Sequence, residues 1–359
     1  MPASTSFSHV DPPLWAVVLA GGVGSRFWPV STPRRPKQLL PLAGERPLIT
    51  ETVARISPLV PAPRLRILTG EALAGPILAE LPELNRENLL VEPVARGTAP
   101  VLAWAAHEIA RRDPDAVMIS LHADHDIEPD DAFRELLAHL AGLAARHPYL
   151  FTIGVTPNRP ETGYGYIRVG ERLEGAAEAH RVAEFVEKPD RRTAEEYLRQ
   201  GGYLWNSGIF VWGVRTFLDE LGRHTPELAQ LLPLLEEGDV RGFFDRAPNL
   251  SVDEGLLERS DHVAVAPATF RWDDVGAWEA VGRARRTDEA GNVAVGDAHL
   301  VDAGGCIVWA EEGSVVVFGA QDLVVVRTRD VTFVAPRDRT PDLKALLERL
   351  PDRLRRLES

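Results

Sequence analysis

The sequence is poor in cysteine and has no long apolar segment. Its 359 residues contain one cysteine, Cys306, so no disulfide can form within the chain, and a cytoplasmic location is expected. No apolar run reaches the length of a membrane-spanning helix, so we expect no membrane partner. Residues 1–14 lack the basic and apolar regions of a signal peptide, and we expect a flexible tail there. The formal net charge of −13 argues against a nucleic-acid partner, because nucleic-acid binders carry a basic face.

Lysine is also scarce. Of the 40 basic residues only Lys37, Lys188 and Lys344 are lysines, so 37 are arginines. Because the chain uses arginine almost everywhere, a lysine indicates a place that needs a compact ammonium group on a flexible stem. Lys344 lies in a C-terminal helix pattern, where chance is a sufficient explanation. The other two lie in the segments RRPKQ and FVEKP, and we expect them to have functional roles.

A glycine-rich loop follows the first apolar run but matches neither standard phosphate-binding motif. Residues 15–42 read WAVVLAGGVGSRFWPVSTPRRPKQLLPL. The loop has no Gly-Lys-Ser/Thr ending, and a G-x-G-x-x-G pattern starting at Gly22 would need glycine where Phe27 stands. Its glycines still let backbone N–H groups approach an anion, and Arg26 and Lys37 add full charges. An ordinary Gly/Pro turn does not require these two cations, so the segment predicts a triphosphate site.

Apolar strand patterns alternate with amphipathic helix patterns over much of the chain. Strands are expected at 15–20, 64–70, 116–121 and 149–155, and helices at 99–112 and 131–147. This alternation predicts an α/β domain with a mixed, mostly parallel sheet and helices on both faces. Ligands of such sheets bind at the carboxyl ends of the strands, where the glycine loop and a second polar segment are both expected.

The pattern changes after about residue 288. Short valine-rich runs broken by Gly and Asp replace the alternation, and a helix pattern interrupted at Pro351 follows them. These runs predict a small β-solenoid-like module. The expected organisation is a tail (1–14), a first domain (15–287) and the β module with its terminal helix (288–359). We expect the module to cover the first domain and to serve oligomerisation, with a homodimer as the assembly considered.

The segment HADHD, from His122 to Asp126, is a polar cluster at a strand end and indicates a metal. A zinc hydrolase is the rival interpretation, but the chain has no H-E-x-x-H motif. Carboxylate oxygens favour a hard cation, so we expect Asp124 to hold Mg²⁺ beside the phosphates of the glycine loop. A second carboxylate is expected from FRWDDVGAW, where Asp273 and Asp274 stand between aromatic residues.

Three segments in the middle of the chain carry groups suited to a phosphorylated sugar. PETGYGYI brings two glycines to the start of a strand, and FVEKP places Glu187 and Lys188 at a strand end. WNSGIF places Asn206 and Ser207 in what we expect to be a turn between apolar runs. Carboxylate and amide groups suit sugar hydroxyls, and an ammonium group suits a phosphate.

In this order, the strings LAGGVGSR, PKQ, VEPVARGTAP, ADH, PETGYGYI, FVEKP, WNSGIF and WDDVGAW resemble the bacterial mannose-1-phosphate guanylyltransferases. The resemblance runs from about residue 15 into the β module. It implies a Rossmann-like nucleotidyltransferase domain followed by a short left-handed β-helix. It also implies Mg²⁺-dependent transfer of GMP from GTP to mannose 1-phosphate, giving GDP-mannose and pyrophosphate. Some relatives carry a further isomerase domain, for which this chain is too short, so the single-function form is expected.

The resemblance also assigns site residues. For the nucleotide it implies Leu19, Ala20, Gly21, Gly22, Gly24, Ser25, Arg26, Lys37, Glu92, Arg96, Thr98 and Asp124. For the sugar phosphate it implies Tyr164, Gly165, Glu187, Lys188, Asn206 and Ser207. For the metal it implies Asp124 and Asp274. The catalytic set is then Arg26, Lys37, Asp124, Lys188 and Asp274.

The chemistry fits these residues, because the attacking sugar phosphate is already anionic and needs no general base. Positioning and electrostatic stabilisation then dominate catalysis. His122 stands where the family usually has proline, and Gly97 where it usually has asparagine. The second difference is expected to loosen contact with the nucleotide. SVDEGLLER also lacks a tyrosine of the family pattern. The alternatives are a nucleotidyltransferase for another nucleotide and sugar 1-phosphate, and a catalytically silent regulatory homologue.

Overall fold

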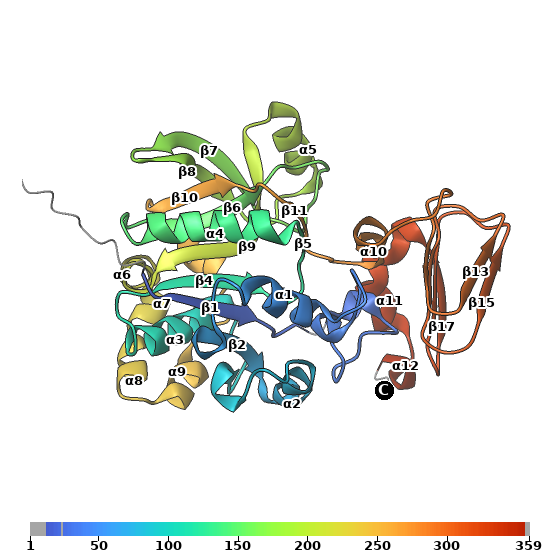
Figure 1. The fold of residues 1–359 in the computed structure, drawn as a ribbon, viewed down its shortest axis with the longest axis horizontal. Coiled ribbons are helices and arrows are strands. Elements are labelled where there is room, and N and C mark those ends of the chain that lie inside the picture. Colours follow the sequence, from blue (N-terminus) through green and yellow to red (C-terminus); the bar gives the residue numbers. More distant parts are fainter. Residues whose placement is uncertain (1–11, 23, 356–359) are drawn as a thin grey trace, which may run out of the picture.

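The computed structural model describes residues 12–22 and 24–355 (Figure 1). A large α/β body contains most of the chain, and the C-terminal strands form a lobe at one end of it (Figure 1). Most of the tail expected over residues 1–14 lies outside the described residues, and β1 begins at Leu14.

Nine strands form one sheet in the order β3-β2-β1-β4-β9-β6-β10-β8-β7. Their bounds are β1 (Leu14–Leu19), β2 (Leu65–Gly70), β3 (Leu89–Glu92), β4 (Val117–His122), β6 (Leu150–Val155), β7 (Tyr166–Leu173), β8 (Ala176–Val186), β9 (Tyr203–Gly213) and β10 (Val263–Pro267). Strands β3, β2, β1 and β4 run parallel, whereas β9 is antiparallel to β4 and β6. The predicted mixed sheet is confirmed, and its parallel part carries the glycine loop. A separate antiparallel ribbon pairs β5 (Asp126–Glu128) with β11 (Arg271–Asp273).

Helices cover both faces of the large sheet, as predicted (Figure 1). One face packs against α1 (Leu48–Ile56), α2 (Glu71–Glu80), α4 (Asp130–Ala144) and α5 (Arg191–Gln200). The other packs against α3 (Thr98–Ala110), α6 (Val214–His224), α7 (Pro226–Ala229), α8 (Leu232–Glu236) and α9 (Val240–Arg246). Ala16 and Val18 join the first core and Trp15 and Val17 the second, because side chains alternate along a strand. A strand buried on both faces therefore reads as a continuous apolar run.

Short helical turns complete the chain. They are Ser25–Phe27, Lys37–Leu39, Ala62–Arg64, Arg86–Asn88, the π-type turn Asp253–Leu257, and Arg337–Asp342. Among the helices of the described residues, none has the length and apolar character needed to cross a membrane.

The turn expected at Asn206 and Ser207 is wrong, because both residues lie inside β9. Two polar residues followed by glycine imitate a turn signal. Here Gly208, at φ 70°, and a register shift between β6 and β9 let the strand continue past a local irregularity. The sheet itself satisfies the polar groups, since Ser207 Oγ donates to the carbonyl of Ile153 at 2.7 Å.

The C-terminal lobe is a coil of short strands. Its two sheets have the orders β12-β14-β16-β17 and β13-β15, and only the β16–β17 pair is antiparallel. The bounds are β12 (Val293–Val295), β13 (Ala298–Val301), β14 (Ile307–Ala310), β15 (Val315–Phe318), β16 (Leu323–Arg327) and β17 (Thr332–Pro336). Helix α10 (Trp278–Ala284) precedes the coil, and α11 (Leu343–Arg349) and α12 (Asp352–Arg355) follow it. The predicted β-helix-like module is confirmed.

The lobe and the first domain share a hydrophobic core. Trp309 and Phe333 of the lobe belong to the same buried cluster as Phe27 and Trp28, which follow the glycine loop. The rings of Trp28 and Phe333 meet edge to face, with centroids 5.7 Å apart. The lobe therefore supports the segment that connects the glycine loop to Lys37.

Candidate active site

The glycine loop leaves β1 between two neighbouring parallel strands. Leu19, the last residue of β1, is the register partner of Leu68 on β2 and of His122 on β4. Beyond the strand end, Ala20 N–H donates to the carbonyl of Leu68 at 2.9 Å, and Ala123 N–H donates to that of Leu19 at 3.0 Å. The glycine loop and the HADHD segment therefore lie together at the carboxyl ends of the strands, as expected.

Gly24 is the point where the loop touches Lys37. Its φ of 68° lies in the left-handed region, and a Cβ there would collide with Cβ of Lys37. Only glycine combines that backbone with such a close approach. The next residue, Gln38, donates from Nε2 to the carbonyl of Ala20 at 3.1 Å. The sequence analysis did not assign Gln38, although the string PKQ contains it.

A cavity of about 340 Å³ opens beside the glycine loop. Seven of the twelve residues assigned to the nucleotide line it: Leu19, Ala20, Gly21, Gly22, Glu92, Thr98 and Asp124. Burial raises the pKa of the Glu92 carboxyl group. The residues assigned to the nucleotide that do not line the cavity are Gly24, Ser25, Arg26, Lys37 and Arg96. Arg96 is engaged by α9 instead, where its Nε donates to the carbonyl of Phe244 at 3.0 Å.

Gly97 is required by local packing. Its φ is 82°, and a Cβ would approach the carbonyl oxygen of Leu250 to 2.5 Å. The same oxygen accepts from Ala99 N–H at 3.1 Å, and Thr98 Oγ1 accepts from Val252 N–H at 2.8 Å. The difference from the family pattern at this position therefore accompanies a close contact between the start of α3 and residues 250–252.

The β5–β11 ribbon brings the two expected metal-binding acids together. Asp126 and Asp273 are register partners, so Asp124, just before β5, and Asp274, just after β11, lie at the same end of the ribbon. Nζ of Lys37 lies 2.9 Å from Asp124 Oδ2 and donates to the backbone carbonyl of Asp274 at 2.5 Å. The structure thus joins two acids and one lysine that the sequence assigned to the same reaction.

The two carboxyl groups have different electrostatic surroundings. Burial opposes the ionisation of Asp124, but Lys37 and the two neighbouring histidines hold its pKa at about 2. For Asp274 burial dominates and raises the pKa, although Lys37 and a hydrogen bond from Tyr164 act in the opposite direction. That bond runs from the Tyr164 hydroxyl to Asp274 Oδ1 at 2.5 Å.

Asp273 has a structural partner. Arg283 Nε donates to its Oδ2 at 2.7 Å, and Val275 N–H donates to its Oδ1 at 2.9 Å. Val275 has a φ of 47°, which is rare for a β-branched residue and indicates a backbone held by its surroundings. Asp274 is therefore the member of the acidic pair that remains for a ligand.

The histidines beside Asp124 do not complete a zinc site. One ligand atom from each of His122, Asp124 and His125 lies within 4.8 Å of the others. Trp272 Nε1, however, donates to Nδ1 of His125 at 3.1 Å, which places the proton of that ring on Nε2. Burial lowers the pKa of both imidazoles, and a neutral imidazole is the form that binds zinc, so the hydrogen bond from Trp272, and not charge, keeps His125 from acting as a ligand. The oxygens of Asp124 and Asp274 fit a hard cation better than this set fits zinc.

A second cavity, of about 410 Å³, has two basic residues of the predicted catalytic set in its wall. Its lining includes Arg26, Tyr164, Lys188 and Asp274. Arg26 therefore faces this cavity and not the first. Lys188 has a φ of 48°, and its Nζ lies 2.6 Å from Oε1 of Glu187.

Gly165, Glu187 and Asn206 meet at one point. A Cβ on Gly165 would lie 2.5 Å from Glu187 Oε2 and 3.3 Å from Asn206 Cβ. Oε2 of Glu187 is buried and has no hydrogen-bond partner among the described residues, so it is available to accept from a polar group of a ligand. Ser207 is 2 % exposed and bonded within the sheet. Of the six residues assigned to the sugar phosphate, Gly165, Glu187 and Asn206 therefore converge. Tyr164 and Lys188 line the second cavity, and Ser207 bonds within the sheet.

Two further acids reach this point and were missed in the sequence analysis. Asn206 Nδ2 donates to Asp253 Oδ1 at 2.7 Å, and Glu187 N–H donates to Glu258 Oε1 at 3.1 Å. Both belong to the segment SVDEGLLER, where the sequence drew attention only to an absent tyrosine. The three acidic residues of this segment, Asp253, Glu254 and Glu258, were the signal that could have marked it as part of a polar site.

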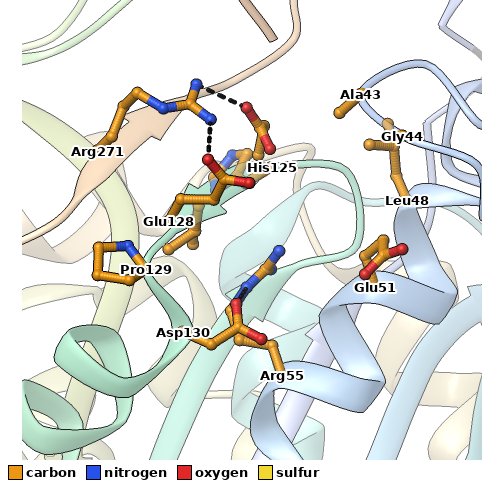
Figure 2. Close-up of a pocket in the computed structure, with 12 residues that line it drawn as sticks. Ala43, Gly44, Leu48, Glu51, Arg55, His125, Glu128, Pro129, Asp130 and Arg271 are labelled. Atoms are coloured by element: carbon orange, nitrogen blue, oxygen red, sulfur yellow. Dashed lines mark hydrogen bonds and ion pairs between the residues drawn. The ribbon is translucent and has the colours of Figure 1, made fainter. Parts of the chain in front are cut away.

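A further cavity, of about 640 Å³, is lined by residues of the β5–β11 ribbon and of α1 (Figure 2). Arg271 pairs there with Asp126 at 2.8 Å and with Glu128 at 2.9 Å. Ala43, Gly44 and Leu48 form the facing wall (Figure 2). His125 also lines this cavity, but no residue of the glycine loop does.

Comparisons with known proteins place both parts of the chain. Residues 15–291 match the family described as nucleotidyl transferase, and residues 296–350 match the family described as MannoseP isomerase/GMP-like beta-helix domain. Mannose-1-phosphate guanylyltransferase of Klebsiella pneumoniae is 36 % identical over 348 residues, which cover 93 % of this chain and 73 % of that protein. Alginate biosynthesis protein AlgA of Pseudomonas aeruginosa is 36 % identical over 93 % of this chain and 71 % of its own length. A crystal structure named mannose-1-phosphate geranyltransferase, from Thermus thermophilus, is 34 % identical with a TM-score of 0.86, over 94 % of this chain and 99 % of that one.

Proposed function

The chain belongs to the nucleotidyl transferase family, among the bacterial mannose-1-phosphate guanylyltransferases, and from this premise we propose how its residues act. The reaction transfers GMP from GTP to mannose 1-phosphate and gives GDP-mannose and pyrophosphate. Three findings support this activity. Two segments match family models, the sequence identity extends over most of the chain, and the solved structure is similar.

One observation carries the mechanism. Asp124 and Asp274 converge on Lys37, between a cavity lined by the glycine loop and a cavity lined by Lys188. The first cavity suits the nucleotide, because exposed backbone N–H groups at a strand end bind phosphates. The second suits the sugar phosphate. The reacting phosphates would then meet at the two acids.

The transfer is a single displacement. A phosphate oxygen of the sugar phosphate attacks the α-phosphorus of GTP, the new P–O bond forms, and the bond to the leaving pyrophosphate breaks with its electron pair. No proton has to be removed from the nucleophile, so the site needs positive charge and not a general base. Lys37 stabilises the leaving pyrophosphate, and Lys188 orients the attacking phosphate. Arg26 lines the same cavity as Lys188, so it also acts on the sugar phosphate.

A divalent cation completes the charge balance. Members of this family generally use one, and we propose Mg²⁺ held by Asp124 and Asp274, because these oxygens suit a hard cation. When bound, it neutralises the two approaching phosphates. Lys37 contacts the Asp124 carboxylate and the Asp274 backbone carbonyl, so its ammonium group would lie beside the cation and could reach the phosphates of the nucleotide.

Product analysis tests the proposal. GTP labelled at the α-phosphate should pass its label to GDP-mannose only when mannose 1-phosphate is present, with one pyrophosphate released per GDP-mannose. Binding of both ligands without transfer would identify a regulatory homologue, and release of phosphate from GTP alone would identify a hydrolase.

We propose further that residues 15–287 carry the chemistry, that residues 288–359 support the glycine loop, and that the enzyme works in the cytoplasm as a homodimer. The exposed side chains Val301, Val316 and Phe318 on the outer strands of the lobe support an interface between copies. Light scattering should give twice the chain mass of 39.5 kDa, and a single chain mass would contradict the dimer.

A further inference from the structure

The amide group of Asn206 is held at both ends. Its Oδ1 accepts from Gly208 N–H at 3.2 Å and from Thr152 Oγ1 at 3.0 Å, and its Nδ2 donates to Asp253 Oδ1 at 2.7 Å. A backbone N–H can only donate and the Asp253 oxygen accepts, so both ends agree on which amide atom is the nitrogen. The amide is therefore fixed in one orientation.

Asn206 keeps one unused donor next to an unused acceptor. Nδ2 carries two hydrogens. Within residues 12–22 and 24–355 its only hydrogen-bond partner is Asp253, so one hydrogen bonds to Asp253 and the other is unused. Glu187 Oε2, buried and also without a partner, lies at the same point beside Gly165. Two hydroxyl groups of a sugar ring would satisfy both, one by accepting and one by donating.

The position of Asp253 is set from the nucleotide side of the site. The preceding residue, Val252, donates its N–H to Thr98 Oγ1 at 2.8 Å, and the Leu250 carbonyl accepts from Ala99 N–H at 3.1 Å. Thr98 lines the nucleotide cavity. The segment that carries Asp253 is therefore tied to a wall of that cavity, so Asp253 holds Asn206 from an anchor outside the cluster of Gly165, Glu187 and Asn206.

We propose that Asp253 is a positioning residue that determines which sugar 1-phosphate is used. By holding one hydrogen of Asn206 Nδ2, Asp253 directs the other hydrogen to a ring hydroxyl, while Glu187 Oε2 accepts from a neighbouring hydroxyl. A sugar with a hydroxyl in the other configuration leaves a buried donor or acceptor unpaired, which lowers its transition-state binding. This inference rests on the proposed function and concerns its sugar specificity.

A merely electrostatic role for Asp253 is the competing explanation. Asp253 could act by balancing the charge of Lys188, but Lys188 is already paired with Glu187 at 2.6 Å. The two roles differ in what an asparagine at this position would do. Asparagine keeps an oxygen that accepts from Asn206 Nδ2 and removes the charge, whereas alanine removes both.

The experiment compares Asp253→Ala and Asp253→Asn. The readout is the ratio of kcat/KM for the preferred sugar 1-phosphate to kcat/KM for its 2-epimer, which for mannose is glucose 1-phosphate. Asp253→Ala should lower this ratio about 10- to 100-fold and raise the KM of the sugar phosphate. The KM of GTP should change by less than about threefold. Asp253→Asn should keep the ratio within about threefold of the wild type.

Thr152→Val provides a second variant that removes a hydrogen bond from the other end of the amide. Thr152 is fully buried and valine has nearly its shape, so the fold should persist. One donor to Oδ1, Gly208 N–H, remains, so the ratio should fall less than in Asp253→Ala. Both changes act on one amide, and their combined effect should be smaller than the product of the two. Asp261→Asn, an exposed acid nearby in the sequence, serves as the control and should change nothing.

Two results would overturn the proposal. An unchanged sugar ratio in folded Asp253→Ala would show that Asp253 does not orient Asn206. A loss of the ratio in Asp253→Asn as large as in Asp253→Ala would assign the effect to charge. If the wild type prefers another nucleotide and sugar pair, the proposed function fails, and the same ratio measured with that pair still decides the role of Asp253.

Discussion

Asp126 and Asp273 face each other as register partners on the β5–β11 ribbon, and this pairing delivers Asp124 and Asp274 to the same end. Neither acid can be placed beside the other by local structure alone, because they are far apart in the sequence. Lys37 contacts both, through the Asp124 side chain and the Asp274 carbonyl. The ribbon is therefore the element that assembles the proposed metal site.

Replacing either acid should remove catalysis with little effect on folding. Asp124→Asn or Asp274→Asn should cost at least ~3 kcal/mol of transition-state stabilisation, or about a hundredfold in kcat, because the cation loses a carboxylate ligand. Chelation should stop the wild type, and added Mg²⁺ should restore it. Asp302→Asn, on the exposed surface of the lobe, is the matched control. Near-normal kcat in either site variant at saturating Mg²⁺ would exclude that acid from the metal site.

Replacing each of the three lysines should have a different effect on kcat and on the KM of the two substrates. Lys188→Ala should raise the KM of the sugar phosphate more than that of GTP, because Lys188 lines the second cavity. Lys37→Ala should lower kcat or raise the KM of GTP, since Lys37 lies between the two acids. Lys344→Ala, in the exposed part of α11, should do neither. Steady-state kinetics with each substrate varied in turn gives the answer, and equal effects of all three changes would refute the assignment.

Restoring the asparagine of the family pattern at position 97 should destabilise this chain. The φ of 82° suits glycine, and a Cβ would lie 2.5 Å from the Leu250 carbonyl oxygen. Gly97→Asn should lower the free energy of unfolding by about 2–4 kcal/mol, with Gly97→Ala at least as severe. Denaturant unfolding measures this, with Gly222→Ala in α6 as a control where a Cβ has open space. An unchanged midpoint for Gly97→Asn would show that the backbone at 97 is not constrained.

Asp253 should make stability fall as pH rises. Its pKa is raised from 3.8 to about 7, first by burial and then by the charge of Glu187, while Asn206 and Lys188 oppose the rise. Between these two values the folded protein holds more protons than the unfolded chain, so the free energy of unfolding falls through this window. The stabilisation is complete below about pH 4 and lost above about pH 7.

The comparison of wild type with Asp253→Asn isolates this effect. The variant should gain on the order of 2–4 kcal/mol relative to the wild type between pH 4 and pH 7.5 and no more above. Glu258 is also close to Glu187, and its raised pKa is present in both proteins and cancels in the difference. A difference in unfolding free energy that stays constant across this range would contradict a raised pKa for Asp253.

Local patterns predicted the sheet and the glycine loop correctly because burial sets both. Val17 and Val18 are buried on opposite faces, so β1 reads as one apolar run, and its loop must emerge at a strand end. The residue strings also identified Lys37, Asp124 and Asp274, which the structure brings together. The resemblance could not specify which cavity each residue lines. It assigned Arg26 to the nucleotide, whereas in the structure Arg26 faces the second cavity and not the first.

Features that depend on tertiary contacts could not be predicted from the sequence. Asn206 looked like part of a turn because the signal is local, whereas its strand is defined by pairing with β4 and β6. Asp253 was missed because nothing in SVDEGLLER shows that its acid will face Asn206. Gly97 looked like a loss of nucleotide contact, while its reason is the approach of Leu250.

The measurement that tests the central claim most directly is pyrophosphate release, with the four common nucleoside triphosphates crossed with mannose, glucose and galactose 1-phosphates. We predict the highest kcat/KM for GTP with mannose 1-phosphate. Glucose 1-phosphate should be about 10- to 100-fold poorer, because one hydroxyl contact is lost. Any leakage should appear first among the nucleotides, since Gly97 offers no side chain to the nucleotide cavity that it lines. A higher kcat/KM for another pair, such as UTP or dTTP with glucose 1-phosphate, would contradict the account.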